Sequence, residues 1–361
     1  MHYLHHHVKS AHVLIAYRDF KDYGGDYDYD DYNSEGNKCH RGLGVNALHT
    51  AKVLRKHGIR CDIAPVWDVD GLRKALQTYM PTHVIIEAFW IKGPEMSQLC
   101  MDFPAIQFVV RCHSQIGFLQ VEPGAIGTMR DLLRLQEILL NLTVSTNTSR
   151  LQVFVERTYK SRCLLLPNLY DIERVNRQPG VVHDHRNLRI GCFGAHRLLK
   201  NHTTSAAAAL MIADRRGCDL EFYINSGRAE NAQSKSIKLA LENMFADLRW
   251  AKIIEVPWEE WSSFRLTVSH MDLTIQASFT ETFNIVSSDS VAEGVPAVVG
   301  PAIEWAPESW KAEPDDADDI ARVGSALLSD QYAPQDGLKA LTGYVHDGVH
   351  KWEAYLNSNP T

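Results

Sequence analysis

Short apolar runs alternate with segments of helical period along most of the chain. The runs in the first half are rich in Val, Ile and Leu, and they predict buried strands at residues 12–17, 61–66, 83–88, 106–112 and 163–166. Segments with a helical spacing of apolar residues predict helices at 45–57, 72–79, 129–140 and 149–159. Because such strands have no face suited to water, we expect a parallel sheet covered by helices on both sides.

The same alternation starts again in the second half. It predicts strands at 188–193, 220–224, 253–258, 271–276 and 297–299, and helices at 203–216, 284–294 and 338–356. Residues 171–187, between the two halves, are polar and contain Pro179-Gly180, which is typical of a linker. The sequence therefore predicts an α/β fold of two domains, residues 1–170 and 188–335, joined by the linker 171–187 and followed by a helical segment, 336–361.

The composition is that of a soluble globular protein with room for two cores. The chain has 361 residues, 45% hydrophobic and 22% charged, and no apolar run approaches the roughly 20 residues of a membrane span. Seven scattered cysteines without C-x-x-C spacing predict reduced thiols rather than disulfides or a zinc site. Since the N-terminus lacks the apolar core of a signal peptide, we expect a cytoplasmic protein. The net charge of −7 argues against binding nucleic acid by charge alone, although it leaves a local basic face open.

Residues 278–300 are the stretch richest in candidate chemistry. Two carboxylates, Glu281 and Asp289, stand with seven residues between them around a helix start, for which Asn284 and Ser287 are candidate N-caps. A helix that follows a buried strand points its first N–H groups at the carboxyl edge of the sheet, which suits a phosphate or a sugar hydroxyl. Glu281 is placed to accept hydrogen bonds from hydroxyls and Asp289 to bind a ribose diol. The alternative is that both are ordinary loop and helix acids.

This stretch resembles the E-x7-E signature of retaining glycosyltransferases of family 4, which have the GT-B fold. The matching positions are Glu281, Phe283, Ala292, Gly294, Val295 and Pro296. The chain departs from the signature at Asn284, Asp289 and Glu293, where the family usually has Gly, Glu and a small or sulfur residue. The resemblance implies two Rossmann-like domains with a ligand cleft between them, and a last helix, 336–361, that returns to the N-terminal domain. It also implies transfer of a sugar from a nucleotide-diphosphate sugar to an acceptor hydroxyl with retention of configuration, without a metal and with no cofactor beyond that co-substrate.

A second segment, residues 194–201, carries the same resemblance. Its sequence, G-A-H-R-L-L-K-N, is similar to the family's G-R-L-x-x-x-K-N/G segment, in which Arg and Lys hold the diphosphate. Arg197 and Lys200 follow a strand end and can reach one anion, Arg as a planar fork and Lys as a point charge. The resemblance implies a catalytic set of His113, Arg197, Lys200 and Glu281. It implies a donor-binding set of Gly42, Gly44, Gly194, Arg197, Lys200, Pro257, Trp258, Glu281, Thr282, Phe283, Asn284, Ile285 and Asp289.

Three places in the first half carry candidate chemistry. Gly42 and Gly44 open a helix, where backbone N–H groups can approach a phosphate closely; an ordinary turn is the alternative. His113 ends a strand, where open α/β sheets place ligand groups, and the resemblance implies a contact with the transferred sugar; a hydrogen bond within the fold is the alternative. Residues 19–35 hold seven acids and four tyrosines, and they are either a solvated loop or an acceptor-side lid whose tyrosines stack on a ring.

The sequence leaves the acceptor open among a glycan, a small molecule and modified DNA. A glycosyltransferase acting on hydroxymethylated DNA bases, as in some phages, would need a basic groove in the first domain. A GT-B-like protein that binds a nucleotide without transfer, and a phosphorylase or epimerase relative, are further alternatives. The presence of Arg197, Lys200 and Glu281 together argues against a protein that only binds a nucleotide. The motifs of the second half favour a transferase over an epimerase, and they leave a phosphorylase that uses phosphate open.

Overall fold

The computed structural model describes residues 11–18, 42–173, 186–225 and 232–358, which form two compact units. The described part of the first unit comprises residues 11–18, 42–171 and 345–358, and that of the second comprises 172–173, 186–225 and 232–344. The acidic, tyrosine-rich stretch 19–35, most of the predicted linker, and residues 226–231 lie outside the described residues.

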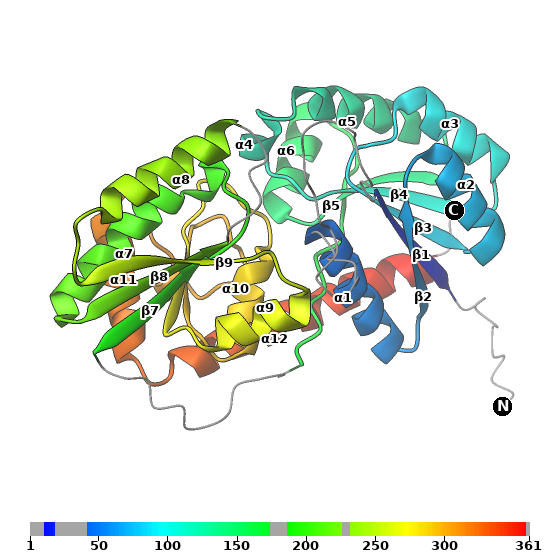
Figure 1. The fold of residues 1–361 in the computed structure, drawn as a ribbon. Coiled ribbons are helices and arrows are strands. Elements are labelled where there is room, and N and C mark those ends of the chain that lie inside the picture. Colours follow the sequence, from blue (N-terminus) through cyan, green and yellow to red (C-terminus); the bar gives the residue numbers. More distant parts are fainter. Residues whose placement is uncertain (1–10, 19–41, 174–185, 226–231, 359–361) are drawn as a thin grey trace, which may run out of the picture. The chain divides into compact units, whose positions relative to one another are not determined.

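The first unit is a six-stranded parallel sheet with helices on both faces. The strands lie in the order β2-β1-β3-β4-β5-β6 (Figure 1). Their bounds are β1 His12–Arg18, β2 Arg60–Val66, β3 His83–Glu87, β4 Gln107–Cys112, β5 Leu142–Thr146 and β6 Leu164–Leu165. The helices are α1 Gly42–Lys56, α2 Val69–Tyr79, α3 Gly93–Asp102, α4 Ile116–Leu119, α5 Pro123–Gln136 and α6 Ser149–Tyr159.

Strand β1 shows why this sheet needs helices on both faces. Val13 and Ile15 enter a core shared with α1 and the end of the last helix, whereas Leu14 and Ala16 enter a core shared with α2, α3, α5 and α6. Successive side chains of a strand point to opposite faces, so an uninterrupted apolar run supplies both cores.

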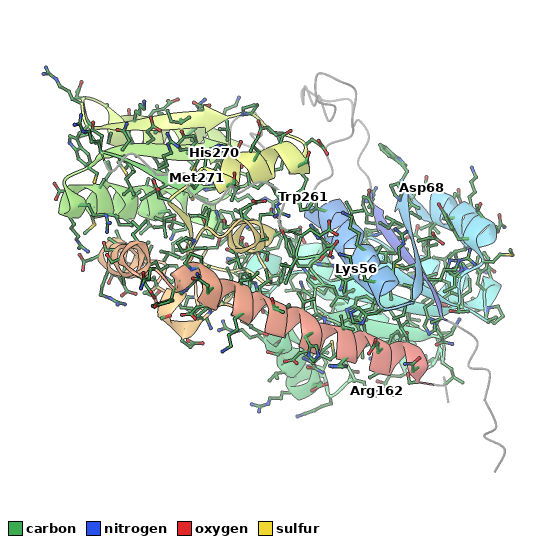
Figure 2. The ribbon with its side chains drawn as sticks, turned by 90° about the horizontal axis from the view of Figure 1, so that it is seen from below. Lys56, Asp68, Arg162, Trp261, His270 and Met271 are labelled. Atoms are coloured by element: carbon green, nitrogen blue, oxygen red, sulfur yellow. The ribbon has the colours of Figure 1, made fainter. Side chains whose placement is uncertain are left out.

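At the end of α1, Lys56, which is labelled in Figure 2, forms an ion pair of 2.6 Å with Asp171.

The second unit is a five-stranded parallel sheet in the order β11-β10-β7-β8-β9. Its strands are β7 Asn187–Cys192, β8 Asp219–Asn225, β9 Ala251–Val256, β10 Leu273–Gln276 and β11 Ala297–Val299. Its helices are η1 Leu198–Lys200, α7 His202–Arg216, α8 Ala232–Phe245, α9 Trp261–Ser269, α10 Ile285–Ala292, η2 Glu308–Trp310, α11 Ala317–Ser329 and the first part of α12 Ala333–Asn357. The chain runs outward from β7 to β9 and then returns to the other side of β7, so the order reverses between β7 and β10. Such switch points are where open α/β sheets bind ligands, at the carboxyl ends of the strands.

Every predicted strand corresponds to an observed strand, but β5 and the helices α3, α4, α8 and α9 were not predicted, and of α11 the sequence indicated only a helix start at 313–319. Strand β5 reads L-T-V-S-T, and its Ser145 and Thr146 are buried even though they are polar. Helix α9 reads W-S-S-F-R-L-T-V-S, in which β-branched and aromatic residues obscure the helical period. In both elements the tertiary contacts, rather than the local pattern, decide the structure.

The cysteines and the helices of the described ranges can be compared with what the composition predicts for disulfides and membrane spans. Six cysteines in the described ranges are free, and burial raises the pKa of five of them, Cys61, Cys100, Cys112, Cys163 and Cys192, to about 12. These five side chains are therefore thiols rather than thiolates at neutral pH. Among the described residues no helix is both long and apolar enough to cross a membrane.

Helix α12 offers a matched pair of glycines for a test of its packing. A Cβ built on Gly337 would lie 2.2 Å from the buried ring of Trp310, whereas one on Gly343 meets nothing within 4 Å. We expect Gly337→Ala to lower the free energy of unfolding by about 1–3 kcal/mol, because the indole must move in a packed core. We expect Gly343→Ala to raise it by about 0.5–1 kcal/mol, because alanine favours an exposed helix. Urea denaturation measures both, and equal effects would contradict the packing at Trp310.

Candidate functional site

The loops after β7 and β10 meet at the switch point of the second unit. Lys200, at the end of η1, forms an ion pair with Glu281, which lies 81 residues further along the chain. The two side chains are 25% and 17% exposed, so the pair is largely shielded but open to solvent on one side. The structure thus brings together one residue from each of the two segments that carry the sequence resemblance.

Asn284 holds this arrangement to the start of α10. It is the N-cap residue with φ 57°, and its Oδ1 accepts a hydrogen bond of 2.9 Å from the Ser287 N–H. Its Nδ2 donates to Gln276 Oε1 at 3.2 Å and to Glu281 Oε2 at 3.3 Å. A positive φ is the conformation that glycine adopts freely and asparagine tolerates, which explains why Asn can stand where the resembling family has Gly. The asparagine in addition orients the Glu281 carboxylate.

The residues that follow in this segment differ in their exposure. The Thr282 N–H donates to Glu281 Oε1 at 3.3 Å, and Ile285 lies half-buried in the first turn of α10. Phe283 is buried, its ring stacks on Tyr344 with centroids 5.6 Å apart, and its carbonyl accepts from Trp305 Nε1 at 2.7 Å. Glu281 is therefore the side chain of this turn that faces solvent beside a cation.

Asp289 lies inside the second unit. Its side chain is 1% exposed, and Oδ1 accepts a hydrogen bond of 3.0 Å from Trp261 Nε1, at the start of α9 (Figure 2). One turn later Glu293 pairs with Arg265 at 2.6 Å, with both side chains fully buried, and the Arg265 guanidinium lies 5.1 Å from the Trp261 ring. These contacts fasten α10 to α9 and account for the charged Glu293 where the resembling family has a small or sulfur residue.

Residues 193–202, from the loop after β7 to the first residue of α7, carry both cations and neutral imidazoles. Gly194 has φ 114°, and its N–H donates to Asn225 Oδ1 at 2.8 Å. Burial lowers the pKa of His202 to about 3, and burial also lowers the pKa of His196, whose ring lies edge-on to it at 4.8 Å. Both imidazoles are therefore neutral at pH 7, so the positive charge of this loop comes from the half-buried Arg197 and from Lys200.

Asn201 anchors this loop to the end of β10. It adopts the left-handed conformation with φ 59°, and its Nδ2 donates to the carbonyls of Ala277, at 2.9 Å, and Pro314, at 2.5 Å. Pro257 and Trp258 follow β9, the edge strand, which is two strands from β7 in the sheet. Pro257 is exposed and Trp258 half-buried, and neither is brought to the Lys200–Glu281 pair by a described contact.

In the first unit, His113 belongs to a buried charged cluster at the ends of β3 and β4. Its Nε2 bonds to Glu87, and Arg111 donates to the same carboxylate from Nε at 2.9 Å and from Nη2 at 2.6 Å. Arg111 also donates to the carbonyls of Leu166 and Pro167, and lies 5.1 Å from the Trp352 ring centroid. The sequence analysis missed Glu87 and Arg111, although a charged residue at the end of each of two apolar strands was the available signal.

Burial and neighbouring charges set the protonation states of Glu87 and His113 in this cluster. Burial opposes ionisation of Glu87, but the charge of Arg111, together with the hydrogen bonds from Arg111 and His113, outweighs it and lowers the pKa of Glu87 to about 2. Burial lowers the pKa of His113. Because an ionised carboxylate only accepts hydrogen bonds, a neutral His113 carries its proton on Nε2, and its Nδ1 is left as an acceptor.

Gly42 and Gly44 lie in the first turn of α1, after the carboxyl end of β1. A Cβ built on Gly44 would come within 3.2 Å of the Tyr17 ring, whereas one on Gly42 would meet nothing within 4 Å. Gly44 therefore allows α1 to pack closely on β1, whereas a Cβ on Gly42 would touch none of the described residues.

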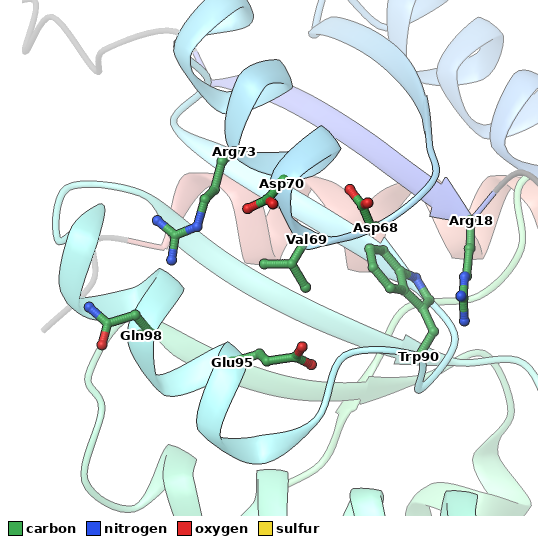
Figure 3. A pocket seen from close by; sticks show the side chains of 8 residues that line it. All are labelled: Arg18, Asp68, Val69, Asp70, Arg73, Trp90, Glu95 and Gln98. Carbon is green, nitrogen blue, oxygen red and sulfur yellow. The ribbon is translucent and has the colours of Figure 1, made fainter.

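A pocket of about 420 Å³ lies beside the switch point of the first unit, between the loops that follow β2 and β3 (Figure 3). Trp90 forms one side of it, and the indole Nε1 is buried without a hydrogen-bond partner among the described residues. Asp68 caps α2 by accepting from the Gly71 N–H at 2.8 Å, and Arg73 is paired with Asp102, outside the lining. The lining residues are Arg18, Asp68, Val69, Asp70, Arg73, Trp90, Glu95 and Gln98. No group of three or more metal-ligating side chains that could hold a metal ion occurs within the described ranges.

The Glu87–Arg111 pair can be tested against an exposed pair in the same unit. Arg111→Met leaves the buried Glu87 carboxylate without its main partner, so we expect the free energy of unfolding to fall by about 3–5 kcal/mol. Arg73→Met, which breaks the partly exposed pair with Asp102, should cost less than about 1 kcal/mol. Denaturant unfolding of both variants at neutral pH gives the comparison, and a loss below 1 kcal/mol in Arg111→Met would show that Glu87 does not need this guanidinium.

Solved structures with the same architecture cover nearly the whole chain. The sucrose-phosphate synthase of Thermosynechococcus elongatus aligns with a TM-score of 0.66 at 14% identity, over 95% of this chain and 98% of that one. The UDP-forming α,α-trehalose-phosphate synthase of Burkholderia xenovorans, in complex with glucose-6-phosphate, aligns with 0.66 at 12% identity, over 96% and 100%. A structure described as trehalose-6-phosphate from E. coli, bound with UDP-2-fluoro-glucose, aligns with 0.61 at 10% identity, over 97% and 99%.

No protein-family model and no curated protein matches the sequence. At identities of 10–14% the structural likeness concerns the fold. The prediction of an α/β protein with two Rossmann-like parallel sheets is confirmed, and the fold is the one found in GT-B glycosyltransferase structures.

Proposed function

We propose that this protein is a retaining glycosyltransferase that moves a sugar from a nucleotide-diphosphate sugar to an acceptor hydroxyl. The observation that carries the proposal is the Lys200–Glu281 pair at the switch point of the second sheet. It joins a cation suited to a diphosphate with a carboxylate suited to sugar hydroxyls, beside the first N–H groups of α10. The likeness to a structure that holds UDP-2-fluoro-glucose supports a nucleotide-sugar donor for this chain.

Each group has a separate role in the proposed reaction. Lys200 and Arg197 neutralise the diphosphate as it leaves, with help from the N-terminal N–H groups of α10. Glu281, oriented by Asn284, accepts hydrogen bonds from the hydroxyls of the transferred sugar. The acceptor hydroxyl attacks from the face that the diphosphate leaves, which retains the configuration. Cations and N–H groups perform the neutralisation that a metal would otherwise provide, so the proposed transfer needs no metal.

The buried acids are given supporting roles. Asp289 stabilises α10 through Trp261, because its carboxylate is enclosed by the second unit and already accepts a hydrogen bond. Glu87 sets the tautomer of His113, so that Nδ1 is the acceptor of the imidazole, and His113 is assigned to a hydroxyl of the transferred sugar.

The pocket beside Trp90 is the proposed acceptor site. An indole offers a flat apolar surface for the C–H face of a sugar ring, and the neighbouring carboxylates accept hydrogen bonds from hydroxyls. Asp68, Asp70 and Glu95 outnumber Arg18 and Arg73 in the lining, and Arg73 is already paired with Asp102. The lining therefore favours a neutral or cationic polyhydroxyl acceptor.

The donor site is tested by nucleotide binding. We expect Lys200→Ala and Arg197→Ala each to weaken nucleoside diphosphate binding by about 1.5–3 kcal/mol, because a charged hydrogen bond to the diphosphate is lost. Lys252→Ala, which removes an exposed cation paired with Glu221, is the control and should bind unchanged. Thermal-shift screening against UDP, GDP, ADP, dTDP and CDP with and without EDTA identifies the base, and calorimetry then measures the affinities.

Three results would contradict this assignment. Unchanged affinity in both variants would remove the two cations from the donor site. A thermal shift that EDTA abolishes would show that nucleotide binding needs a metal ion. Inversion at the anomeric carbon, read by NMR from the product of an α-configured donor, would contradict transfer with retention of configuration.

The acceptor site has its own test. Trp90→Ala should raise KM for the acceptor about tenfold, because removing an aromatic contact of this kind costs about 1.4 kcal/mol. The affinity for the nucleotide sugar should not change, since Arg197, Lys200 and Glu281 lie on the other unit. Initial rates over a panel of neutral sugars, amino sugars and sugar phosphates measure the effect, and an equal loss of donor affinity would show that the substitution damages the fold instead.

A further inference from the structure

The C-terminal part of α12 carries two histidines one turn apart. His346 and His350 stand at positions i and i+4, which places them on the same face of a helix. Their Nε2 atoms lie 3.3 Å apart, and the ring centroids lie 4.5 Å apart with the planes nearly perpendicular at 89°. Both side chains are well exposed, at 69% and 62%. They therefore have room to bind a ligand together with water.

The spacing of the two nitrogens is that of two ligands on one metal ion. Zinc binds imidazole nitrogen at about 2.0–2.1 Å in tetrahedral geometry, and two such bonds place their nitrogens about 3.3 Å apart. Two neutral imidazoles can share only one proton between facing nitrogens, whereas one metal ion accepts a lone pair from each. Because both rings are largely exposed, rotation about their side-chain bonds can turn both lone pairs to one ion.

The outer nitrogens of both rings face carboxylates. His346 Nδ1 lies 3.6 Å from Asp347 Oδ1, and His350 Nδ1 lies 3.6 Å from Glu353 Oε2. Glu353 is shared, because its Oε1 lies 3.5 Å from Nδ1 of His57, the residue after α1. A carboxylate beside Nδ1 of a histidine favours the tautomer that carries its proton on Nδ1. The lone pair of Nε2 is then available to a metal ion, which is the arrangement around histidine ligands of metals.

We propose that His346 and His350 bind a divalent transition-metal ion of the zinc class on the exposed face of α12, with water in the remaining coordination positions. Imidazole ligands select Zn²⁺, Cu²⁺ or Ni²⁺ over Mg²⁺ and Ca²⁺, which prefer oxygen. The ion links two successive turns of α12 and so stabilises the helix. The two histidines lie on the first unit, whereas Lys200 and Glu281 of the proposed donor site lie on the second.

The test starts from the full chain with His2, His5, His6 and His7 replaced by Gln, since these N-terminal histidines are a second source of imidazole. Isothermal titration with ZnCl₂ should show one ion bound per chain. His346→Gln and His350→Gln should each weaken that binding at least tenfold, and Glu353→Gln should weaken it by up to about tenfold. His270→Gln, at another exposed histidine whose ring bonds to the Leu266 carbonyl, is the control and should bind as the parent does.

Two further readouts separate this site from general surface binding. The Cu²⁺-loaded parent should show nitrogen hyperfine coupling from two imidazoles in its electron paramagnetic resonance spectrum, reduced to one in either single variant. Zinc should raise the melting temperature of the parent but not of the variant that carries both His346→Gln and His350→Gln. Mg²⁺ should have no effect on either protein. Zinc affinity that survives both substitutions, or that is absent once the N-terminal histidines are removed, would overturn the proposal.

Discussion

Parallel pairing of strands is the constraint on which both units depend. A parallel sheet needs helices on both faces, so its side chains are enclosed along the length of the strands and polar groups are left to the strand ends. Leu14, Ile15 and Ala16 in β1 all have no exposed surface, although they point to alternate faces. The residues that carry candidate chemistry accordingly gather where strands end, with Glu87 as the last residue of β3, Arg111 near the end of β4, and Glu281 in the loop after β10.

The charged pairs of the molecule differ in exposure, and this difference separates support from candidate chemistry. Glu87–Arg111 and Arg265–Glu293 have no exposed side-chain surface, and each costs free energy unless both members remain ionised and bonded. Lys200–Glu281 is partly exposed, so a ligand can replace one partner at lower cost. The enclosed pairs hold strands and helices in place, while the open pair has the freedom that a binding site requires.

The three departures from the resembling family's signature each have a local physical reason or a local partner. Asn284 satisfies a positive φ and caps α10 through Ser287, which a glycine would not do. Glu293 is charged because Arg265 faces it from α9. Asp289 is short and buried, and it accepts from Trp261 rather than reaching out of the unit. These substitutions fit together, because Trp261 and Arg265 both lie on α9 and pack against one helix.

The sequence by itself determined the alternation of strands and helices, the two α/β units, and the candidate segments at 194–201 and 278–300, since these depend on local period and composition. It could not show that Lys200 forms an ion pair with Glu281, or that Glu87 bonds to both Arg111 and His113. Nor could it show that β5 is a strand despite its Ser and Thr. Those facts depend on strand order, which brings residues far apart in the chain to one sheet edge. Local pattern encodes which element forms, whereas pairing between distant elements decides which side chains share a site.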